Sequence, residues 1–314
     1  MIESLIKSLV ASGYHLLTTV PIIVLSIIFA EFLVKKGLLQ KISFIGVPIS
    51  RISHLGNESV SALLTAFLSP TASAAMLRDY YSKGLISRRE LIIASLAKAL
   101  PAIVTEARFM LPPLLTILGM VGLYYFLIQV SMSLMITSIA CLLGFFLLPQ
   151  RPLKSLKVGA DSLPLKVAIK ESLKDSGKII KKILITLIPA TVGASILAGM
   201  GIFSALGDRL REFSQYLPIP PKGLPIVAVY IVSPIASYPI ASTLLAQGVT
   251  AKEVIISFLW GGVLAIPMHL KSHIPFYIGI YGPRTGLELF GYFYGLRSLI
   301  AIMLILAIYN WIEV

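Results

Sequence analysis

The segments Ser69-Pro70-Thr71-Ala72-Ser73 and Ser233-Pro234-Ile235-Ala236-Ser237 carry the same Ser-Pro-x-Ala-Ser pattern in the two halves of the chain. The offset between these segments also takes Gly84 to Gly248, and it holds without a gap on both sides of the pattern. Self-similarity at one fixed offset is typical of internal repeats. The pattern therefore predicts that the chain is a duplication of one structural unit.

The composition is that of a membrane protein. Of the 314 residues, 57% are hydrophobic and only 13% are charged, and the mean hydropathy is +0.90. The charged fraction is about half that of an ordinary soluble domain. Apolar runs over 16–30, 111–148 and 183–206 are too many and too long for buried core helices. These features exclude an ordinary soluble domain and predict an all-α, multi-pass protein of the cell membrane, with the lipid bilayer as its main partner.

The distribution of basic residues predicts the orientation of the chain in the membrane. Residues 150–182 form the longest polar stretch and are rich in Lys and Arg, so the positive-inside rule places them in the cytoplasm. We interpret this stretch as a linker between a first repeat over 1–149 and a second over 183–314. With this orientation the N-terminus lies outside, and most of the 27 Lys and Arg residues lie inside.

The basic clusters on either side of the first Ser-Pro segment both favour the cytoplasmic side. A single crossing between them would place them on opposite sides, and 60–68 is only about half as long as a membrane span. Pro70 removes a backbone donor and biases Ser69 away from helical geometry. We therefore expect a re-entrant hairpin over 60–82. Non-helical backbone at that depth is tolerated only beside protein or a water-filled cavity, so the turn should line something polar.

The complete prediction for the first half is a helix over 15–34, an interfacial amphipathic helix within 38–56, the hairpin, and helices over 89–110 and 122–148. The counterpart of the interfacial helix is 202–217. Three crossings is an odd number, so the second half has the opposite orientation. The fold class is thus an inverted repeat of about three crossing helices and one re-entrant hairpin per half.

The hairpin tips supply the first candidate binding residues. Broken helices near the middle of the membrane can hold a solute or cation through hydroxyl and freed backbone groups. The prolines that break the two hairpins are Pro70 and Pro234. The alternative interpretation is close helix packing, for which small residues are also suited. The candidate substrate-binding residues are Ser69, Thr71, Ser73, Ser233 and Ser237.

Ionisable residues within apolar helices form a second set of candidates, because a charge inside a membrane is costly and often functional. The members of this set are Lys98, Glu106, Arg108, His269, His273 and Arg297. Arg297 needs a partner, for which Glu31, Glu106 and Glu288 are candidates. For Lys98 and Arg297, a structural ion pair and a contact to substrate remain open alternatives.

Prolines predict a second break in each half, at Pro112-Pro113 and within 267–275. His269 and His273 are four residues apart and can share a helix face, but two histidines without a nearby carboxylate or cysteine make a poor metal site. Helix-end anchoring, a proton relay and an anion contact remain as roles. We expect no metal, no cofactor and, with a lone cysteine, no intrachain disulfide.

The stretches 62–73, 84–90 and 233–253 resemble the nucleoside-recognition (Gate) domain membrane proteins. The fold of that family is related to the core of concentrative nucleoside transporters and to the membrane part of ferrous-iron transporters. The resemblance implies inverted repeats with re-entrant hairpins. Nucleoside transporters of this fold carry Gln, Glu or Asn at the tips, whereas the tips here offer Ser, Thr, Ala and Pro, so the resemblance implies a fold rather than a nucleoside substrate.

Two classes of function follow from the sequence. The first is a secondary transporter of a small polar solute or ion, with the substrate near the hairpin tips and alternating access between the repeats. The second is an intramembrane enzyme or a flippase acting on lipid-linked phosphate, for which the intramembrane cations would bind the phosphate. The net charge of +13 is explained by membrane orientation, so no nucleic-acid partner is expected. The sequence favours the transporter over the enzyme and leaves a homo-oligomer open.

Overall fold

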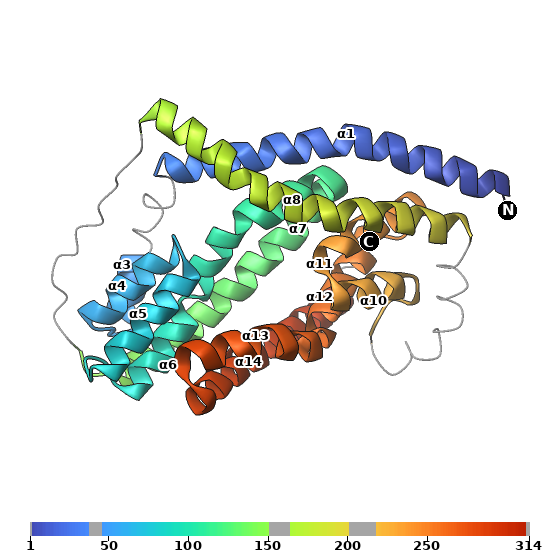
Figure 1. Ribbon diagram of the computed structural model, residues 1–314. Helices are drawn as coiled ribbons and strands as arrows, with labels where there is room; N and C mark the ends of the chain where they lie inside the picture. Colours follow the sequence, from blue (N-terminus) through green and yellow to red (C-terminus); the bar gives the residue numbers. More distant parts are fainter. Residues whose placement is uncertain (1, 38–45, 151–163, 201–217, 312–314) are drawn as a thin grey trace.

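The computed structural model describes residues 2–37, 46–150, 164–200 and 218–311, and this part of the chain contains helices and no strand (Figure 1). The all-helical prediction is therefore confirmed for the described residues. In chain order the α-helices, with one short 3₁₀-helix, are α1 (Ile2–Lys35), α3 (Gly46–Ile52), α4 (Asn57–Ala66), α5 (Pro70–Ser82), α6 (Arg88–Ala97), α7 (Ala99–Leu147), α8 (Leu165–Gly199), η3 (Pro221–Gly223), α10 (Leu224–Val232), α11 (Pro234–Ala246), α12 (Ala251–Leu264), α13 (Ile266–Tyr281) and α14 (Pro283–Trp311).

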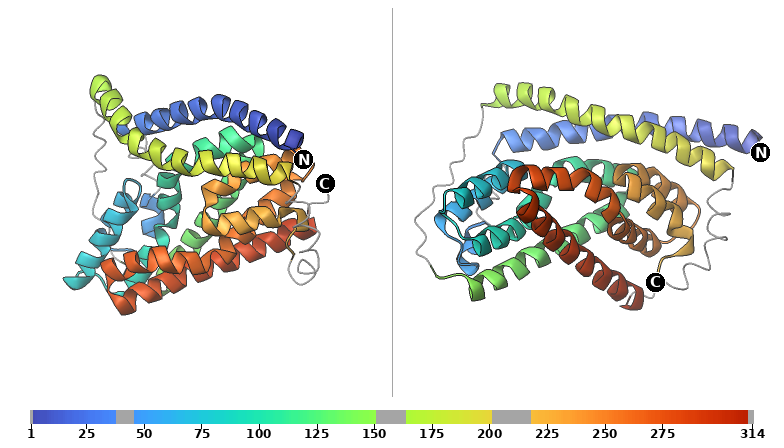
Figure 2. Two further views of the ribbon diagram at one scale, coloured as in Figure 1. Left: turned by 45° about the vertical axis from the view of Figure 1, so that its right-hand side comes forward. Right: turned by 60° about the horizontal axis from the view of Figure 1, so that its bottom comes forward.

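The first helix of each half packs against its counterpart. Helices α1 and α8 lie side by side along one edge of the molecule in all three views (Figures 1 and 2). They are antiparallel, because Lys35 in the last turn of α1 contacts Glu171 and Asp175 near the start of α8. The short helices α3 to α6 gather at one end of the molecule and α10 to α12 at the other, while α7, α13 and α14 run between these ends.

Within the described part of the chain, three helical stretches are long and apolar enough to cross a membrane, judged by length and composition: Leu16–Leu33, Arg88–Leu147 and Pro283–Asn310. Large apolar side chains on their outer faces are exposed, among them Leu17 at 76% and Phe146 at 77%. Such surfaces are unfavourable in water and suit contact with lipid tails. These stretches support the prediction of a helical membrane protein.

The first Ser-Pro segment forms the turn between two packed helices, α4 and α5. Ser69 is extended, with φ −151° and ψ 103°, and its side-chain oxygen accepts a hydrogen bond from the backbone N–H of Ala72 at 3.2 Å. Pro70 occupies the first helical position, where its missing N–H costs nothing and its fixed φ fits the helix. The serine and proline thus end α4 and start α5 in consecutive residues.

The second Ser-Pro segment has the same geometry between α10 and α11, which also pack against each other. Ser233 has φ −156° and ψ 113°, and its side chain accepts from the N–H of Ala236 at 3.4 Å. Pro234 is again the first helical residue. Two identical local patterns therefore adopt one backbone conformation, because capping geometry is decided within a few residues.

Both helix pairs also end alike. Gly84 and Gly248 adopt positive φ values of 70° and 89° just after α5 and α11, a conformation that favours glycine. The next residue in each case bonds back five residues, from Leu85 N–H to the Tyr80 carbonyl at 2.9 Å and from Val249 N–H to that of Leu244 at 3.0 Å. These bonds satisfy carbonyls that the helix end would leave free. The two halves thus share the conformation of these helix ends as well as the order of their helices.

Helix α7 consists of two segments that pack against each other. Gly119 interrupts it with φ 55° and ψ −127°, and the chain reverses there (Figure 1). A Cβ on Gly122 would lie 2.3 Å from the Leu114 carbonyl oxygen, so only glycine permits this close return. The second half repeats the arrangement: Gly282, with φ 82°, separates the packed helices α13 and α14.

The predicted helix over 89–110 is wrong in its bounds, and the predicted break at Pro112-Pro113 is wrong in its place. The break lies at Lys98, between α6 and α7, where the Thr137 hydroxyl accepts from Leu100 N–H and donates to the Ala97 carbonyl, both at 3.1 Å. The two prolines lie inside α7. Membrane helices tolerate interior prolines where neighbouring groups satisfy the freed backbone carbonyls.

In the second half, the predicted break within 267–275 is also wrong, because α13 continues through Pro275. Its ends are Ala265 and Gly282. Of the expected interfacial helices, 46–52 is helical as α3, whereas 38–45 and 202–217 lie outside the described residues. Residues 165–182, expected within the linker, form the first half of α8.

Replacing either capping serine should destabilise the protein, because the variant leaves a backbone N–H of the next helix without its acceptor. We expect Ser69→Ala and Ser233→Ala each to lower the free energy of unfolding by about 1 kcal/mol. Reversible unfolding in mixed micelles measures this. Ser131→Ala is the matched control, because Ser131 is exposed and its hydroxyl donates only to the Leu127 carbonyl of its own helix. Equal effects of all three variants would contradict the capping role.

Candidate functional site

A cavity of about 350 Å³ lies where the two halves meet. Its walls come from α7 of the first half and from α10, α11, α13 and α14 of the second. This volume is at the lower end of the range for small-molecule sites, about 300 to 1,000 Å³. The polar side chains that line it are Glu106, Gln129, Ser133, Tyr230, Tyr238, His273, Tyr294 and Arg297.

Arg297 lies halfway along α14 and lines the cavity. Its Nη2 donates a hydrogen bond to Oε1 of Gln129, from the second segment of α7, at 2.5 Å. Among the described residues no carboxylate forms an ion pair with this guanidinium. The partner of Arg297 is therefore an amide from the other half, and none of the three glutamates considered from the sequence fills that place.

The hydrogen bond to Gln129 is the first of a chain of three. Gln129 Nε2 donates to the Tyr125 hydroxyl at 2.5 Å, and that hydroxyl is 2.7 Å from the hydroxyl of Tyr230. Tyr125 and Tyr230 are buried and pack against the ring of Phe258, at centroid distances of 4.8 and 5.9 Å. The chain joins α14, α7 and α10, so polar contacts fix the cavity wall across both halves.

Glu106 lines the same cavity from the first segment of α7, and its side chain is exposed to it. Its carboxylate makes no hydrogen bond or ion pair with another described residue. Arg297 lines the same cavity from α14. The cavity thus holds two opposite charges that do not contact each other.

His273 is half-buried on α13 and also lines the cavity, with its ring 5.7 Å from that of Tyr294. The side chain of His269 lies outside the described residues. Within the described part of the chain no group of three or more His, Cys, Asp and Glu side chains is placed to hold a metal ion. Helix-end anchoring, a proton relay and an anion contact all stay predictions for His273.

The remaining charged candidates hold helices together. Arg108 pairs with the buried Glu31 of α1 at 3.6 Å, and Lys98 Nζ donates to the Tyr281 hydroxyl at 3.2 Å. Arg284 pairs with Glu288 at 3.6 Å within one turn of α14, and Glu288 also pairs with Arg88 of the first half. Each contact either links a different pair of segments or lies within a single helical turn. These cations therefore do not form one site.

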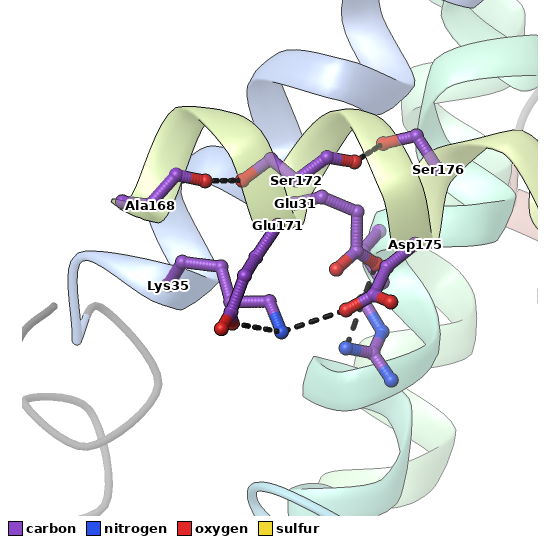
Figure 3. Close-up of polar contacts among 8 residues, drawn as sticks. Glu31, Lys35, Ala168, Glu171, Ser172, Asp175 and Ser176 are labelled. Atoms are coloured by element: carbon purple, nitrogen blue, oxygen red, sulfur yellow. Dashed lines mark hydrogen bonds and ion pairs between the residues drawn. The ribbon is translucent and has the colours of Figure 1, made fainter. Parts of the chain in front are cut away.

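Polar contacts between α1 and α8 extend the Glu31 pair into a cluster (Figure 3). Lys35 Nζ lies 2.7 Å from Asp175 and 3.3 Å from Glu171, both on α8, and these carboxylates raise the pKa of Lys35 above its ordinary value. Figure 3 shows all of these side chains turned toward the space between the two helices. The cluster fixes the end of α1 to the start of α8.

The hairpin-tip residues occupy other positions. The hydroxyl oxygens of Ser69 and Ser233 accept capping bonds, Thr71 is exposed, and Ser237 donates to the Pro234 carbonyl at 2.5 Å. Ser73 is fully buried, and its hydroxyl has no hydrogen-bond partner among the described residues. Pro234 lines the cavity, so one of the two tips reaches it. Binding by the serines and Thr71 stays a prediction.

Sequence reasoning missed the residues that organise the site. Gln129 is an amide within the apolar run 111–148, and that contrast was the available signal. Tyr125 and Tyr230 carry no such signal, because tyrosine is common in membrane helices and only their hydroxyl contact reveals a role. The sequence-predicted residues that the structure brings together at the cavity are Glu106, Pro234, His273 and Arg297.

Two further polar residues support the first helix pair and were also missed. The buried carboxylate of Glu90 accepts from Gly56 N–H at 2.9 Å and from the Ser59 hydroxyl at 2.8 Å, at the start of α4. The buried Thr105 hydroxyl lies 3.1 and 2.9 Å from the carbonyls of Ala66 and Phe67, at its end. Side chains of α6 and α7 thus supply hydrogen-bond partners at both ends of α4.

Three uncharacterised proteins of Methanocaldococcus jannaschii are similar to this chain along nearly its whole length. The first is 29% identical over 92% of this chain and 93% of its own length. The second is 28% identical over 90% and 93%, and the third is 23% identical over 92% and 91%. No family model matches the chain. No solved structure matches it. The matched stretches therefore take in sequence from both halves.

Breaking the hydrogen-bond chain at its middle should destabilise the protein. Tyr125→Phe removes the hydroxyl that accepts from Gln129, which leaves a buried amide N–H unpaired at a cost of about 1 to 3 kcal/mol. Unfolding in mixed micelles measures the loss. Tyr124→Phe is the control, because Tyr124 precedes Tyr125 in the chain and is 50% exposed. Equal stability of the two variants would contradict the network.

Proposed function

We propose that the protein is a secondary transporter of a small polar solute, which binds in the cavity between the halves. The observation that carries this proposal is the cavity itself, lined from both halves and carrying Glu106 and Arg297 without an ion pair between them. Opposed charges inside a membrane are expensive to maintain and are characteristic of substrate and ion pathways. In inverted-repeat transporters, sites lie at the interface of the repeats.

The architecture that we propose is an inverted repeat with two re-entrant helix pairs. Helices α4 and α5 have 10 and 13 residues, and α10 and α11 have 9 and 13, whereas a membrane span needs about 20. Each pair can therefore enter the membrane only partway and return. The matched caps and turns of the two halves support a common origin, and the position of the pairs at opposite ends supports opposite orientation (Figure 1). The resemblance to Gate-domain proteins belongs to the same proposal.

The topology that fits this architecture places residues 150–182 in the cytoplasm and the N-terminus outside. The antiparallel packing of α1 and α8 supports it, because the basic end of α1 then lies on the same side as the start of α8. The two segments of α7 and the pair α13 and α14 supply the return crossings. The 29 residues of α14 are sufficient for a crossing, whereas the 16 residues of α13 are shorter than a typical span of about 20.

Transport would require the halves to move against each other. Helix α5 packs on α13, and α11 packs on α7, so each helix pair of one half covers a long helix of the other. The polar contacts that join the halves around the cavity are reversible: Arg88 with Glu288, Lys98 with Tyr281, Arg297 with Gln129, and Tyr125 with Tyr230. Exchange of such contacts is a common basis for rocking of one repeat against the other.

The alternative function on lipid-linked phosphate is less well supported. A phosphate site needs several cations directed at one point. Of the cations expected for it, Arg108 is engaged by Glu31, Lys98 by Tyr281 and Arg284 by Glu288. Among the described side chains, Arg297 and His273 line the cavity, together with Glu106, whose carboxylate would repel a phosphate.

An uptake screen in proteoliposomes tests the proposal with neutral, anionic, cationic and zwitterionic solutes. We expect uptake of at least one class, and a decrease of at least about tenfold for both Glu106→Gln and Arg297→Gln, because each loses a charge-assisted contact. Asp79→Asn is the control, since Asp79 is exposed and pairs only with Lys83 in its own helix. Release of phosphate from lipid-linked substrates without uptake of any solute would contradict transport.

A further inference from the structure

We infer that the solute bound in this cavity is a small zwitterion of the amino-acid type, carrying an ammonium and a carboxylate group and an apolar side chain. This inference rests on the proposed function and names its substrate class. Three features of the cavity carry it: the unpaired carboxylate, the oriented guanidinium and the apolar remainder of the wall.

The unpaired carboxylate is that of Glu106. It is exposed to the cavity and makes no hydrogen bond or ion pair with another described residue. A carboxylate removed from water is costly unless it gains a cationic partner. An ammonium group in the cavity would supply that partner.

The oriented guanidinium is that of Arg297. Gln129 holds one of its nitrogens, and Gln129 is itself fixed by Tyr125, so the position of the charge is set before any ligand binds. A guanidinium presents five donors in a planar fork that matches a carboxylate. The Gln129 contact uses one donor, which leaves others for a carboxylate in the cavity.

The two charges require a ligand with both signs. They line one cavity of about 350 Å³ without contacting each other, so a small molecule between them can reach both. A ligand with one charge would satisfy one of the two residues and leave the other desolvated without a partner. Sites that bury polar groups discriminate strongly against ligands that leave them unpaired.

Apolar and aromatic side chains form much of the remaining wall, and they indicate the nature of the ligand's third group. Ile103, Phe109, Met110, Ile235 and Phe293 line the cavity together with the charged residues. These side chains would contact an aliphatic or aromatic group and would gain nothing from a second charge. The chemistry therefore favours leucine- or phenylalanine-like solutes over acidic or basic ones.

A series of three probes of similar shape tests the inference with the purified full chain in nanodiscs. L-Phenylalanine has both charges, 2-phenylethylamine keeps the ammonium and 3-phenylpropionate keeps the carboxylate. We expect L-phenylalanine to bind, by calorimetry, at least about tenfold more tightly than either analogue, since each analogue loses one charge-assisted contact. Equal binding of the three probes, or tighter binding of a singly charged one, would overturn the inference.

Two variants assign each charge to its residue. In Glu106→Gln the ammonium should lose its partner, so L-phenylalanine and 3-phenylpropionate should bind equally. In Arg297→Gln the carboxylate should lose its partner, so L-phenylalanine and 2-phenylethylamine should bind equally. Asp79→Asn should keep the full preference. A preference for L-phenylalanine that survives in both cavity variants would overturn the assignment. If a variant fails to fold, the three-probe series on the unmodified chain still tests the inference.

Two outcomes of the uptake and binding experiments distinguish failure of this inference from failure of the proposed function. Uptake of a neutral, anionic or cationic solute that depends on Glu106 and Arg297, with no binding of L-phenylalanine or L-leucine, would overturn the zwitterion and keep the transporter. Absence of uptake for every solute class, with the protein folded in the vesicles, would overturn both.

Discussion

Backbone groups at a helix end need hydrogen-bond partners, and inside a membrane water cannot supply them. The architecture of this protein depends on how each break in its helices meets that need. Ser69 and Ser233 cap the helices that they start, Glu90 and Thr105 hold the two ends of α4, and Thr137 bridges the break at Lys98. Because its own side chains satisfy the breaks, the chain can use short helices that stop partway and turn.

Those turns bring charged side chains of distant segments to one cavity. Glu106 arrives on the first segment of α7, after the break at Lys98, and Arg297 on α14, after the reversal at Gly282. Polar contacts elsewhere, such as the pair of Arg108 with Glu31, fasten the surrounding helices. The protein thus separates charges that stabilise its frame from charges that remain accessible in the cavity, and this separation is the physical basis of the proposed transport.

Local features of the fold were predictable from the sequence, because they depend on a few adjacent residues. The turn at Ser69-Pro70, its copy at Ser233-Pro234 and the glycines that follow them have short-range signals. The predicted break at Pro112-Pro113 was misplaced, because a membrane helix can contain a proline, whereas the chain leaves helical geometry at Lys98 and at Gly119. The partner of Arg297 was not predictable, since Gln129 reaches it only through tertiary packing.

Site-directed cysteine labelling tests the central claim, two oppositely oriented halves around one cavity of alternating access. In a Cys141→Ser background, single cysteines replace Ser82 at the end of α5, Gln247 after α11 and the half-buried Met110 in the cavity wall. A membrane-impermeant maleimide should label position 82 only from the cytoplasmic side, position 247 only from outside, and position 110 from both. Labelling of 82 and 247 from the same side, or of 110 from one side only, would contradict the account.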